Sequence, residues 1–189
     1  MSTHPDIVQK GDPILSDTAK EVSYKEIASP HIQEIIARMK TAMHSQADAV
    51  AIAAPQIGES VRIFVVSDKV FTREGAHPDE THDDMVCINP EITKLSSKTA
   101  WMEEGCLSVR WWYGEVKRAT NVTIRAYDEH GRLFTRGAGG LLAQIFQHET
   151  DHLDGILFDE KARALREQEP GAEEPVPEDI EAPPHTLTS

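Results

Sequence analysis

The sequence predicts a single domain in which helices and strands are combined, followed by a polar tail. Three observations support this: segments near residues 40 and 147 have the apolar spacing of helices, strand-like runs cluster between them, and 189 residues suit one domain with its own core. We place the domain at residues 1–166. Prolines and acids dominate residues 167–189, so we expect this tail to be disordered.

The N-terminal part of the sequence predicts an extended arm followed by a helix. Residues 1–30 mix polar residues, prolines and short apolar pieces, which indicates an extended arm lying on the body of the domain. From His31 to about Gln46, apolar side chains recur at spacings of three and four, as in a helix with one buried face. Ser29 is a suitable cap for this helix, and Pro30 suits its first turn.

The middle of the chain predicts strands joined by turns and loops. Small residues at 49–58 indicate a tight link between the helix and a strand at 61–66. Residues 71–84 are polar and predict a surface loop, whose His77 and His82 are better explained as solvated side chains than as metal ligands. Further strand-like runs occupy residues 85–89, 91–95, 99–102, 121–127, 132–135 and 156–158, and a brief helical piece is expected up to residue 166.

Charge and composition exclude several classes of protein. The formal net charge is −13, but seven acids and no Lys or Arg follow Arg166, so residues 1–166 carry −6. A mildly acidic body without a basic cluster makes direct nucleic-acid binding unexpected. Two cysteines are too few for a disulfide framework, and neither a leader-like segment nor a membrane-spanning run is visible. Together these features indicate a cytoplasmic protein with no membrane association.

A second helical segment carries the strongest chemical signal. Residues 147–152 read Gln-His-Glu-Thr-Asp-His and have apolar residues before them and glycines near both expected ends of the helix. On a helix, His148 and His152 share one face and could bind one ion, with Glu149 beside that ion as a proton acceptor. A core helix with two satisfied histidines is the simpler interpretation, but the His-Glu-x-x-His pattern disfavours it.

A third ligand is needed, because two histidines hold a divalent ion weakly. Phe158 stands where the extended zinc-protease motif requires a third histidine, and later carboxylates fall largely in the tail. Cys106, after a glycine at the expected end of a strand, is the best candidate. A buried structural thiol is the alternative for both cysteines, and we keep it for Cys87 in an apolar strand. Neighbouring acids should raise the pKa of the Cys106 thiol, and a bound metal would overcome this effect.

Three segments together resemble the peptide deformylase family. They read Ala-Val-Ala-Ile-Ala-Ala-Pro-Gln at 49–56, Glu-Gly-Cys-Leu-Ser at 104–108 and Gln-His-Glu-Thr-Asp-His-Leu at 147–153, in that family's order and at about its spacing. The second and third match its motifs fully, and the likeness extends over roughly residues 5–165. The resemblance implies an α+β fold, with mixed or antiparallel sheets around a central metal-binding helix. It also implies removal of the formyl group from the N-terminal formyl-methionine of nascent polypeptides, which releases formate.

The resemblance also implies roles for individual residues. It implies that the metal ligands are Cys106, His148 and His152. It implies that Glu149 is the acid/base, and that Gln56 and the backbone N–H of Leu107 are the two oxyanion donors. The implied cofactor is Fe²⁺, for which Zn²⁺, Ni²⁺ or Co²⁺ can substitute. The implied partners are an N-formyl-methionyl peptide and the ribosome, and the latter follows from the substrate and not from any residue of this chain.

A substrate pocket is expected beside the ion. Leu141 and Ile145 fall on the same helix face as the first histidine, and with Val50 they could form an apolar pocket for a methionine side chain. Ala51 and Gly105 are further candidates for contact with the substrate.

The chain departs from the family pattern in two places. Both glycines of the first motif are alanines, Ala49 and Ala51, and the methyl group of Ala51 could crowd the path of a peptide backbone. Residues 110–113, Arg-Trp-Trp-Tyr, replace the family's usual Pro-x-x-Arg, so we expect an altered substrate groove. Trp111 and Trp112 form either an aromatic rim for the peptide or a packing surface for the arm.

Two other functions are alternatives. A related metallo-hydrolase of the same fold could act on other N-acyl peptides or as a peptidase, although the cysteine ligand and the absent third histidine disfavour a protease. A non-enzymatic, metal-stabilised binding module is weaker, because it would have little need of Glu149 and Gln56. Release of formate, rather than internal cleavage or binding alone, would distinguish the deformylase.

Overall fold

Two α-helices and eight strands form the regular structure of residues 7–71 and 83–168, the part of the chain that this computed structural model describes. The helices are α1 (Pro30–His44) and α2 (Gly140–Leu153). The strands are β1 (Ala51–Ala53), β2 (Ile63–Val66), β3 (Met85–Leu95), β4 (Thr99–Gly105), β5 (Trp112–Ala119), β6 (Asn121–Tyr127), β7 (Leu133–Gly139) and β8 (Arg163–Glu167). The predicted tail beyond residue 168, and loop residues 72–82 with His77 and His82, lie outside the described residues.

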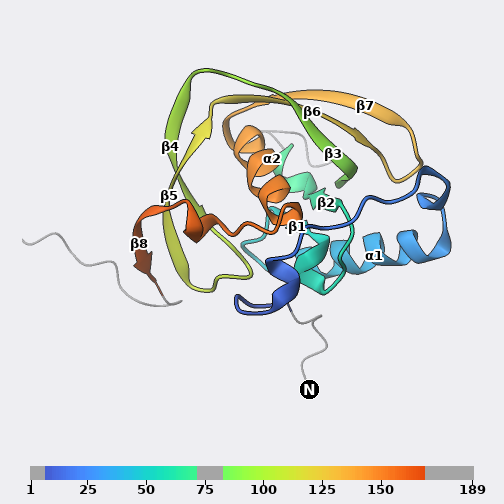
Figure 1. Cartoon of the computed structure of the whole chain (residues 1–189), viewed down its shortest axis with the longest axis horizontal. Coiled ribbons are helices and arrows are strands. Elements are labelled where there is room, and N and C mark those ends of the chain that lie inside the picture. Colours follow the sequence, from blue (N-terminus) through green and yellow to red (C-terminus); the bar gives the residue numbers. More distant parts are fainter. Residues whose placement is uncertain (1–6, 72–82, 169–189) are drawn as a thin grey trace, which may run out of the picture.

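The strands form two antiparallel sheets on either side of α2 (Figure 1). The first sheet has the order β1-β2-β3-β6-β7, and the second has the order β4-β5-β8. Helix α2 contacts β6, β7 and β1 of the first sheet and β5 of the second. This arrangement confirms the predicted α+β fold, with sheets around a central helix.

Helix α2 is anchored by its apolar side and ends where the N-terminal arm passes. Its Phe146 packs against Phe64 of β2, with ring centroids 6.1 Å apart, and both side chains are fully buried. After the helix, Gly155 has a φ of +74°, and a Cβ there would lie 2.5 Å from the carbonyl oxygen of Ser16. A glycine is therefore required at this position for both reasons, the left-handed backbone and the close approach of the arm.

Helix α1 forms as its sequence predicts. The Ser29 hydroxyl accepts a hydrogen bond from the Ile32 N–H at 3.3 Å, and Pro30 occupies the first turn. The apolar stripe from Ile32 to Met43 is buried against β1 and β2. The predicted cap and the predicted buried face are both confirmed.

The N-terminal arm lies on the body, as expected, but it is extended only in part. It contains one-turn 3₁₀ helices at Pro13–Leu15 and Tyr24–Glu26. Between them, the Ala19 N–H donates to the Leu153 carbonyl at 2.9 Å, which ties the arm to the end of α2.

The end of the domain differs from the prediction. The expected strand at 156–158 is wrong, because Phe158–Glu160 forms a 3₁₀ turn and the two residues before it are irregular. The expected helical piece up to Arg166 is also wrong, because Arg163–Glu167 is strand β8, which pairs with β5. All five residues of β8 are exposed, so they carry no apolar pattern that would reveal a strand.

Three further differences concern strands. The predicted runs at 85–89 and 91–95 form one strand, β3, whose register shifts around Asn89, a residue with a positive φ of 50° before a proline. Strand β1 lies within the small-residue segment that we interpreted as a link. Strand β5 has no counterpart in the prediction, because buried Gly114 and Arg118 interrupt its apolar alternation.

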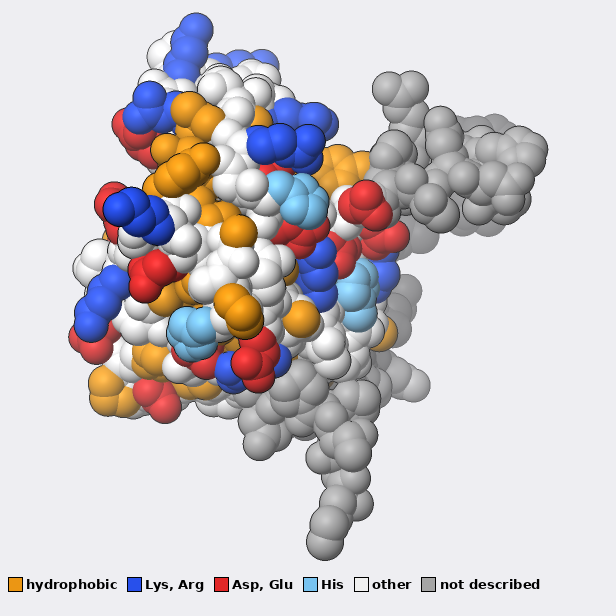
Figure 2. All heavy atoms as spheres, turned by 90° about the vertical axis from the view of Figure 1, so that its right-hand side faces the viewer, with side chains coloured by type: hydrophobic (Ala, Val, Ile, Leu, Met, Phe, Trp, Pro, Cys, Tyr) orange, Lys and Arg blue, Asp and Glu red, His pale blue; other side chains and the backbone are white. Residues whose placement is uncertain are grey.

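The surface carries both signs of charge on the face seen in Figure 2. No helix among residues 7–71 and 83–168 is long and apolar enough to cross a membrane.

Candidate metal and catalytic site

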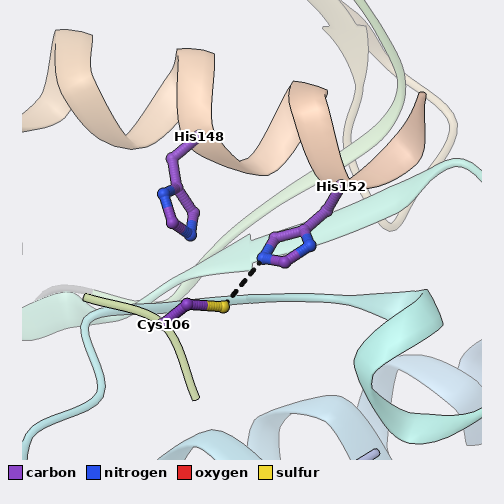
Figure 3. A group of neighbouring side chains, drawn as sticks. All are labelled: Cys106, His148 and His152. Atoms are coloured by element: carbon purple, nitrogen blue, oxygen red, sulfur yellow. Dashed lines mark hydrogen bonds between the residues drawn. The ribbon is translucent and has the colours of Figure 1, made fainter. Parts of the chain in front are cut away.

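The structure brings the side chains of Cys106, His148 and His152 together (Figure 3). The sulfur and one ring nitrogen from each histidine lie within 4.8 Å of one another. Cys106 Sγ is 3.2 Å from His152 Nε2, and the two imidazole centroids are 5.0 Å apart. One sulfur and two imidazoles that converge in this way suit a single transition-metal ion.

Two elements position these three side chains. The histidines are four residues apart on α2, so one helix face carries both. Cys106 directly follows β4, whose last residue, Gly105, pairs with Tyr113 of β5. A Cβ at Gly105 would lie 2.7 Å from the Tyr113 ring, so this glycine allows the hairpin to pack closely and to direct Cys106 toward α2.

The cysteine and the histidines stabilise opposite charges. Burial raises the pKa of the Cys106 thiol, but His152 and His148 outweigh burial and lower the pKa from 9.0 to about 5. Conversely, burial lowers the pKa of His148, but Cys106 and Glu104 raise it well above 6.5. The expectation that neighbouring acids raise the Cys106 pKa is wrong, because Glu104 is paired with Arg118 and His148. A thiolate is the form that binds a metal.

Glu104 orients one of the candidate ligands. Its Oε2 lies 2.9 Å from His148 Nδ1, and its two oxygens accept hydrogen bonds from Arg118 Nε and Nη2 at 2.8 and 2.9 Å. Burial raises the pKa of Glu104, but Arg118 and His148 outweigh burial and hold it at about 2. Arg118 Nη1 also donates to Asp151 Oδ2 at 2.6 Å, which connects this network to α2. When the imidazole is neutral, the ionised Glu104 favours the tautomer with the proton on Nδ1, which makes His148 Nε2 available to a metal.

This network was not identified from the sequence. Glu104 lies two residues before Cys106, but nothing in the sequence marks it as a partner of His148. Arg118 reaches Glu104 only because β4 and β5 are paired, and a strand register is not visible in the sequence.

Glu149 lies beside the three candidate ligands with a free carboxylate oxygen. Its Oε2 is buried and has no hydrogen-bond partner among the described residues. Burial raises the pKa of Glu149 above its ordinary value, although His148 and His152 oppose this rise. A carboxylate with a raised pKa and a free oxygen is suited to accept and return a proton near neutral pH.

Gln56 and the segment after Cys106 are in contact. Gln56 is 2% exposed; its Oε1 accepts from the Ala53 N–H at 2.9 Å, and its Nε2 donates to Ser108 Oγ at 3.1 Å and approaches Cys106 Sγ at 3.5 Å. Both ends of the amide are therefore fixed. Leu107, the other implied oxyanion donor, lies between Cys106 and Ser108 in the same segment.

A cavity of about 290 Å³ opens beside these residues. All five predicted substrate contacts line it: Val50, Ala51, Gly105, Leu141 and Ile145. The candidate catalytic residues Gln56, Leu107 and Glu149 and the candidate ligands Cys106 and His148 line it as well. The cavity therefore joins the apolar residues and the reactive groups in one space.

The residues that depart from the family pattern lie at this cavity. Arg110 pairs with Asp48 at 2.7 Å and stacks 4.5 Å from the Trp111 ring centroid. Trp111 and Trp112 both line the cavity, and Trp112 is 38% exposed. Trp112 also lines a second hollow together with the arm residues Gln9, Lys10 and Gly11, so the two interpretations of these tryptophans, an aromatic rim and a packing surface for the arm, both stay open.

Comparisons with known proteins identify the family of this chain. The family model for polypeptide deformylase matches residues 5–168. The peptide deformylase of Roseiflexus castenholzii is 42% identical over 156 residues, which cover 79% of this chain and 83% of that protein. The chloroplastic peptide deformylase 1A of Solanum lycopersicum is 40% identical over 164 residues, which cover 83% of this chain. The match spans only 59% of that plant protein's length.

Solved structures agree as well. The crystal structure of the class I type b peptide deformylase from Acinetobacter baumannii with bound Met-Ala-Ser matches with a TM-score of 0.74 at 35% identity. The match covers 85% of this chain and 99% of that chain. The chain therefore belongs to the polypeptide deformylase family.

Proposed function

We propose that this chain is a metal-dependent hydrolase that removes the formyl group from the N-terminal formyl-methionine of nascent polypeptides and releases formate. The observation that carries the proposal is the convergence of Cys106, His148 and His152, two of which line one cavity with Glu149 and Gln56. Membership of the deformylase family supports the same reaction.

The proposed ligands are Cys106, His148 and His152. Their fit to a divalent metal rests on the lowered pKa of the Cys106 thiol and on the Glu104 contact that leaves His148 Nε2 free. Fe²⁺ is the proposed ion, and Zn²⁺, Ni²⁺ or Co²⁺ could substitute, since all four accept sulfur and imidazole ligands. Such an ion supplies a Lewis acid that can lower the pKa of water from about 15.7 toward about 7.

The chain's own groups would handle the charge and the protons. Glu149 would accept a proton from the attacking water and transfer it to the departing amine, using its unpartnered Oε2. Gln56 Nε2 and the Leu107 N–H would donate to the formyl oxygen as it becomes negative. One donor of this kind is typically worth about 3 to 4 kcal/mol in the transition state.

The cavity would hold the formyl-methionine in an extended conformation. Strands β1 and β4 are each at an end of their sheet and both contribute to the cavity wall, so a peptide could add beside either edge. Leu141, Ile145 and Val50 would contact the methionine side chain, and Ala51 and Gly105 would lie beside the peptide backbone.

A second candidate is a hydrolase of the same fold with altered specificity, for other N-acyl peptides or as a peptidase. The Arg110, Trp111 and Trp112 side chains at the cavity favour it, because they differ from the family's usual pattern. We further propose a cytoplasmic location, supported by two free cysteines, and an encounter with nascent chains at the ribosome without direct nucleic-acid binding.

The decisive experiment measures metal content and formate release from formyl-Met-Ala-Ser, on protein prepared without oxygen. We expect formate from the wild type and a loss of at least about 100-fold in kcat for Glu149→Gln, because the variant keeps the shape but cannot accept a proton. Equal metal content in the two proteins is the control. Metal-loaded wild type that releases no formate, or that cleaves internal peptide bonds instead, would contradict the proposal.

A further inference from the structure

Residues 8–10 of the arm lie across the two segments that carry the proposed oxyanion donors. The Val8 N–H donates to the Gln56 carbonyl at 2.9 Å, and the Lys10 N–H donates to the Ser108 carbonyl at 2.7 Å. Three consecutive residues of the arm therefore connect a segment near residue 56 to a segment near residue 108. This connection adds to the direct hydrogen bond from Gln56 Nε2 to Ser108 Oγ, which joins the same two segments.

The side chain of Gln9 adds a contact at Leu107 itself. Gln9 Nε2 donates to the Leu107 carbonyl at 3.0 Å and to the Ile7 carbonyl at 3.0 Å. An amide nitrogen has two hydrogens, so it can satisfy both carbonyls at once. A hydrogen bond across 98 residues of sequence thus reaches the peptide group next to the proposed donor.

This contact fixes the peptide group between Leu107 and Ser108 at both ends. Its carbonyl accepts from Gln9, and its N–H donates to Cys106 Sγ at 3.4 Å. Because a peptide group is planar, holding both ends limits rotation of the backbone at Leu107. The direction of the Leu107 N–H is restricted in turn.

We infer that Gln9 is a positioning residue that holds the Leu107 N–H in the geometry required to stabilise the oxyanion. The inference rests on the proposed deformylase reaction. Gln9 is an exposed residue of the arm and acts through Leu107, not by contact with the substrate. Donors that act on charge developed in the transition state affect kcat more than KM, so a displaced donor should lower kcat selectively.

The test compares kcat and KM for formyl-Met-Ala-Ser in full-length, metal-loaded variants. Gln9→Met keeps the length of the side chain but has no donor, and Gln9→Glu points a carboxylate at two carbonyl oxygens. Gln9→Lys restores a donor. We expect Gln9→Met to lower kcat by about three- to tenfold with KM within about twofold, Gln9→Glu to lower it further, and Gln9→Lys to recover most of the rate.

The matched control is Lys10→Met on the same arm. The Lys10 side chain pairs with Asp159, which belongs to neither donor segment, and the substitution keeps the backbone N–H that binds Ser108. We expect its kcat to match the wild type, and we expect equal metal content in all variants. Wild-type kcat in Gln9→Met, failure of Gln9→Lys to recover the rate, or an equal loss in Lys10→Met would overturn the inference while the proposed function stands. A wild type without formate release would overturn both.

Discussion

A single buried carboxylate links the candidate metal site to the rest of the protein. Glu104 contacts the candidate ligand His148 and is paired with Arg118, and the Glu104 and Arg118 side chains are 3% and 5% exposed. A group of this kind sets the tautomer and the direction of a metal-binding imidazole. Removal of its charge should therefore change the affinity for the metal more directly than it changes the rate of the proposed reaction.

The first prediction concerns this carboxylate. Glu104→Gln should weaken metal binding by about 10- to 100-fold, because the neutral amide holds the His148 Nδ1–H less well and leaves Arg118 with Asp151 as its remaining charge partner. Titration of the metal-loaded protein against a chelator measures this change. The adjacent Glu103→Gln is the control, since the Glu103 side chain is 60% exposed and pairs with Arg166. Similar metal affinities in both variants would refute the assigned role.

At the scale of an element, the turn between β6 and β7 is held by one side chain, which accepts hydrogen bonds from backbone N–H groups of the turn. Asp128 Oδ1 accepts from the N–H groups of His130 and Arg132, both at 2.9 Å, and its Oδ2 accepts from Arg132 Nε at 2.7 Å. Partial burial raises the pKa of Asp128, but the Arg132 and His130 donors and the Arg132 charge outweigh burial and hold it below 3.8. The ionised carboxylate therefore stabilises this turn.

The second prediction follows from that pKa. Because the folded pKa lies below the unfolded value, the stabilisation is present above pH 3.8 and is lost as the pH falls below it. Asp128→Asn should lower the free energy of unfolding at pH 7 by roughly 1 kcal/mol, and the difference from the wild type should shrink as the pH approaches 2. Urea unfolding at the two pH values measures both quantities. A difference that stays constant with pH would rule out the ionised carboxylate as the cause.

Elements with a regular apolar pattern could be predicted from the sequence. Elements that depend on pairing with a distant segment of the chain could not. The Ser29 cap of α1 and the apolar stripes of α1 and α2 depend on neighbours along the chain, so the sequence is sufficient to place both helices. Strand β8 is exposed along its length and exists because β5 pairs with it. Strand β5 in turn buries Arg118, which is tolerated only because Glu104 and Asp151 neutralise it.

The same distinction applies to the site. Two histidines at helical spacing and a cysteine after a glycine have a local signature, and the structure brings all three together. The partners that orient these groups, Glu104 on His148 and Gln9 on Leu107, depend on contacts between distant segments. Local spacing carries no information on such contacts.

At the scale of the whole molecule, the three candidate metal ligands come from two layers. Cys106 follows β4 of the smaller sheet, whereas His148 and His152 belong to the central helix that packs against the larger sheet. A bound ion would join these parts with strong bonds that are absent from the unfolded chain. Binding should therefore contribute to folding stability.

The third prediction is that metal removal lowers the melting temperature. At a metal concentration about 100 times Kd, binding contributes about 2.7 kcal/mol, which corresponds to about 5–10 °C for a domain of this size. Thermal unfolding with and without a chelator, followed by addition of Fe²⁺ or Zn²⁺ without oxygen, measures the shift. Cys106→Ser is the control and should respond much less to the chelator. A chelator-independent melting temperature in the metal-loaded wild type would argue against the predicted coupling.

The placement of both histidines on α2 makes the site intolerant of changes in chain length. Each residue added to a helix rotates everything after it by about 100° around the axis. One residue inserted between His148 and His152 would turn the second ring away from the first and away from Cys106, whatever the inserted side chain. The residues between His148 and His152 can therefore change by substitution during evolution. The insertion or deletion of a single codon there would abolish the candidate metal site in one step.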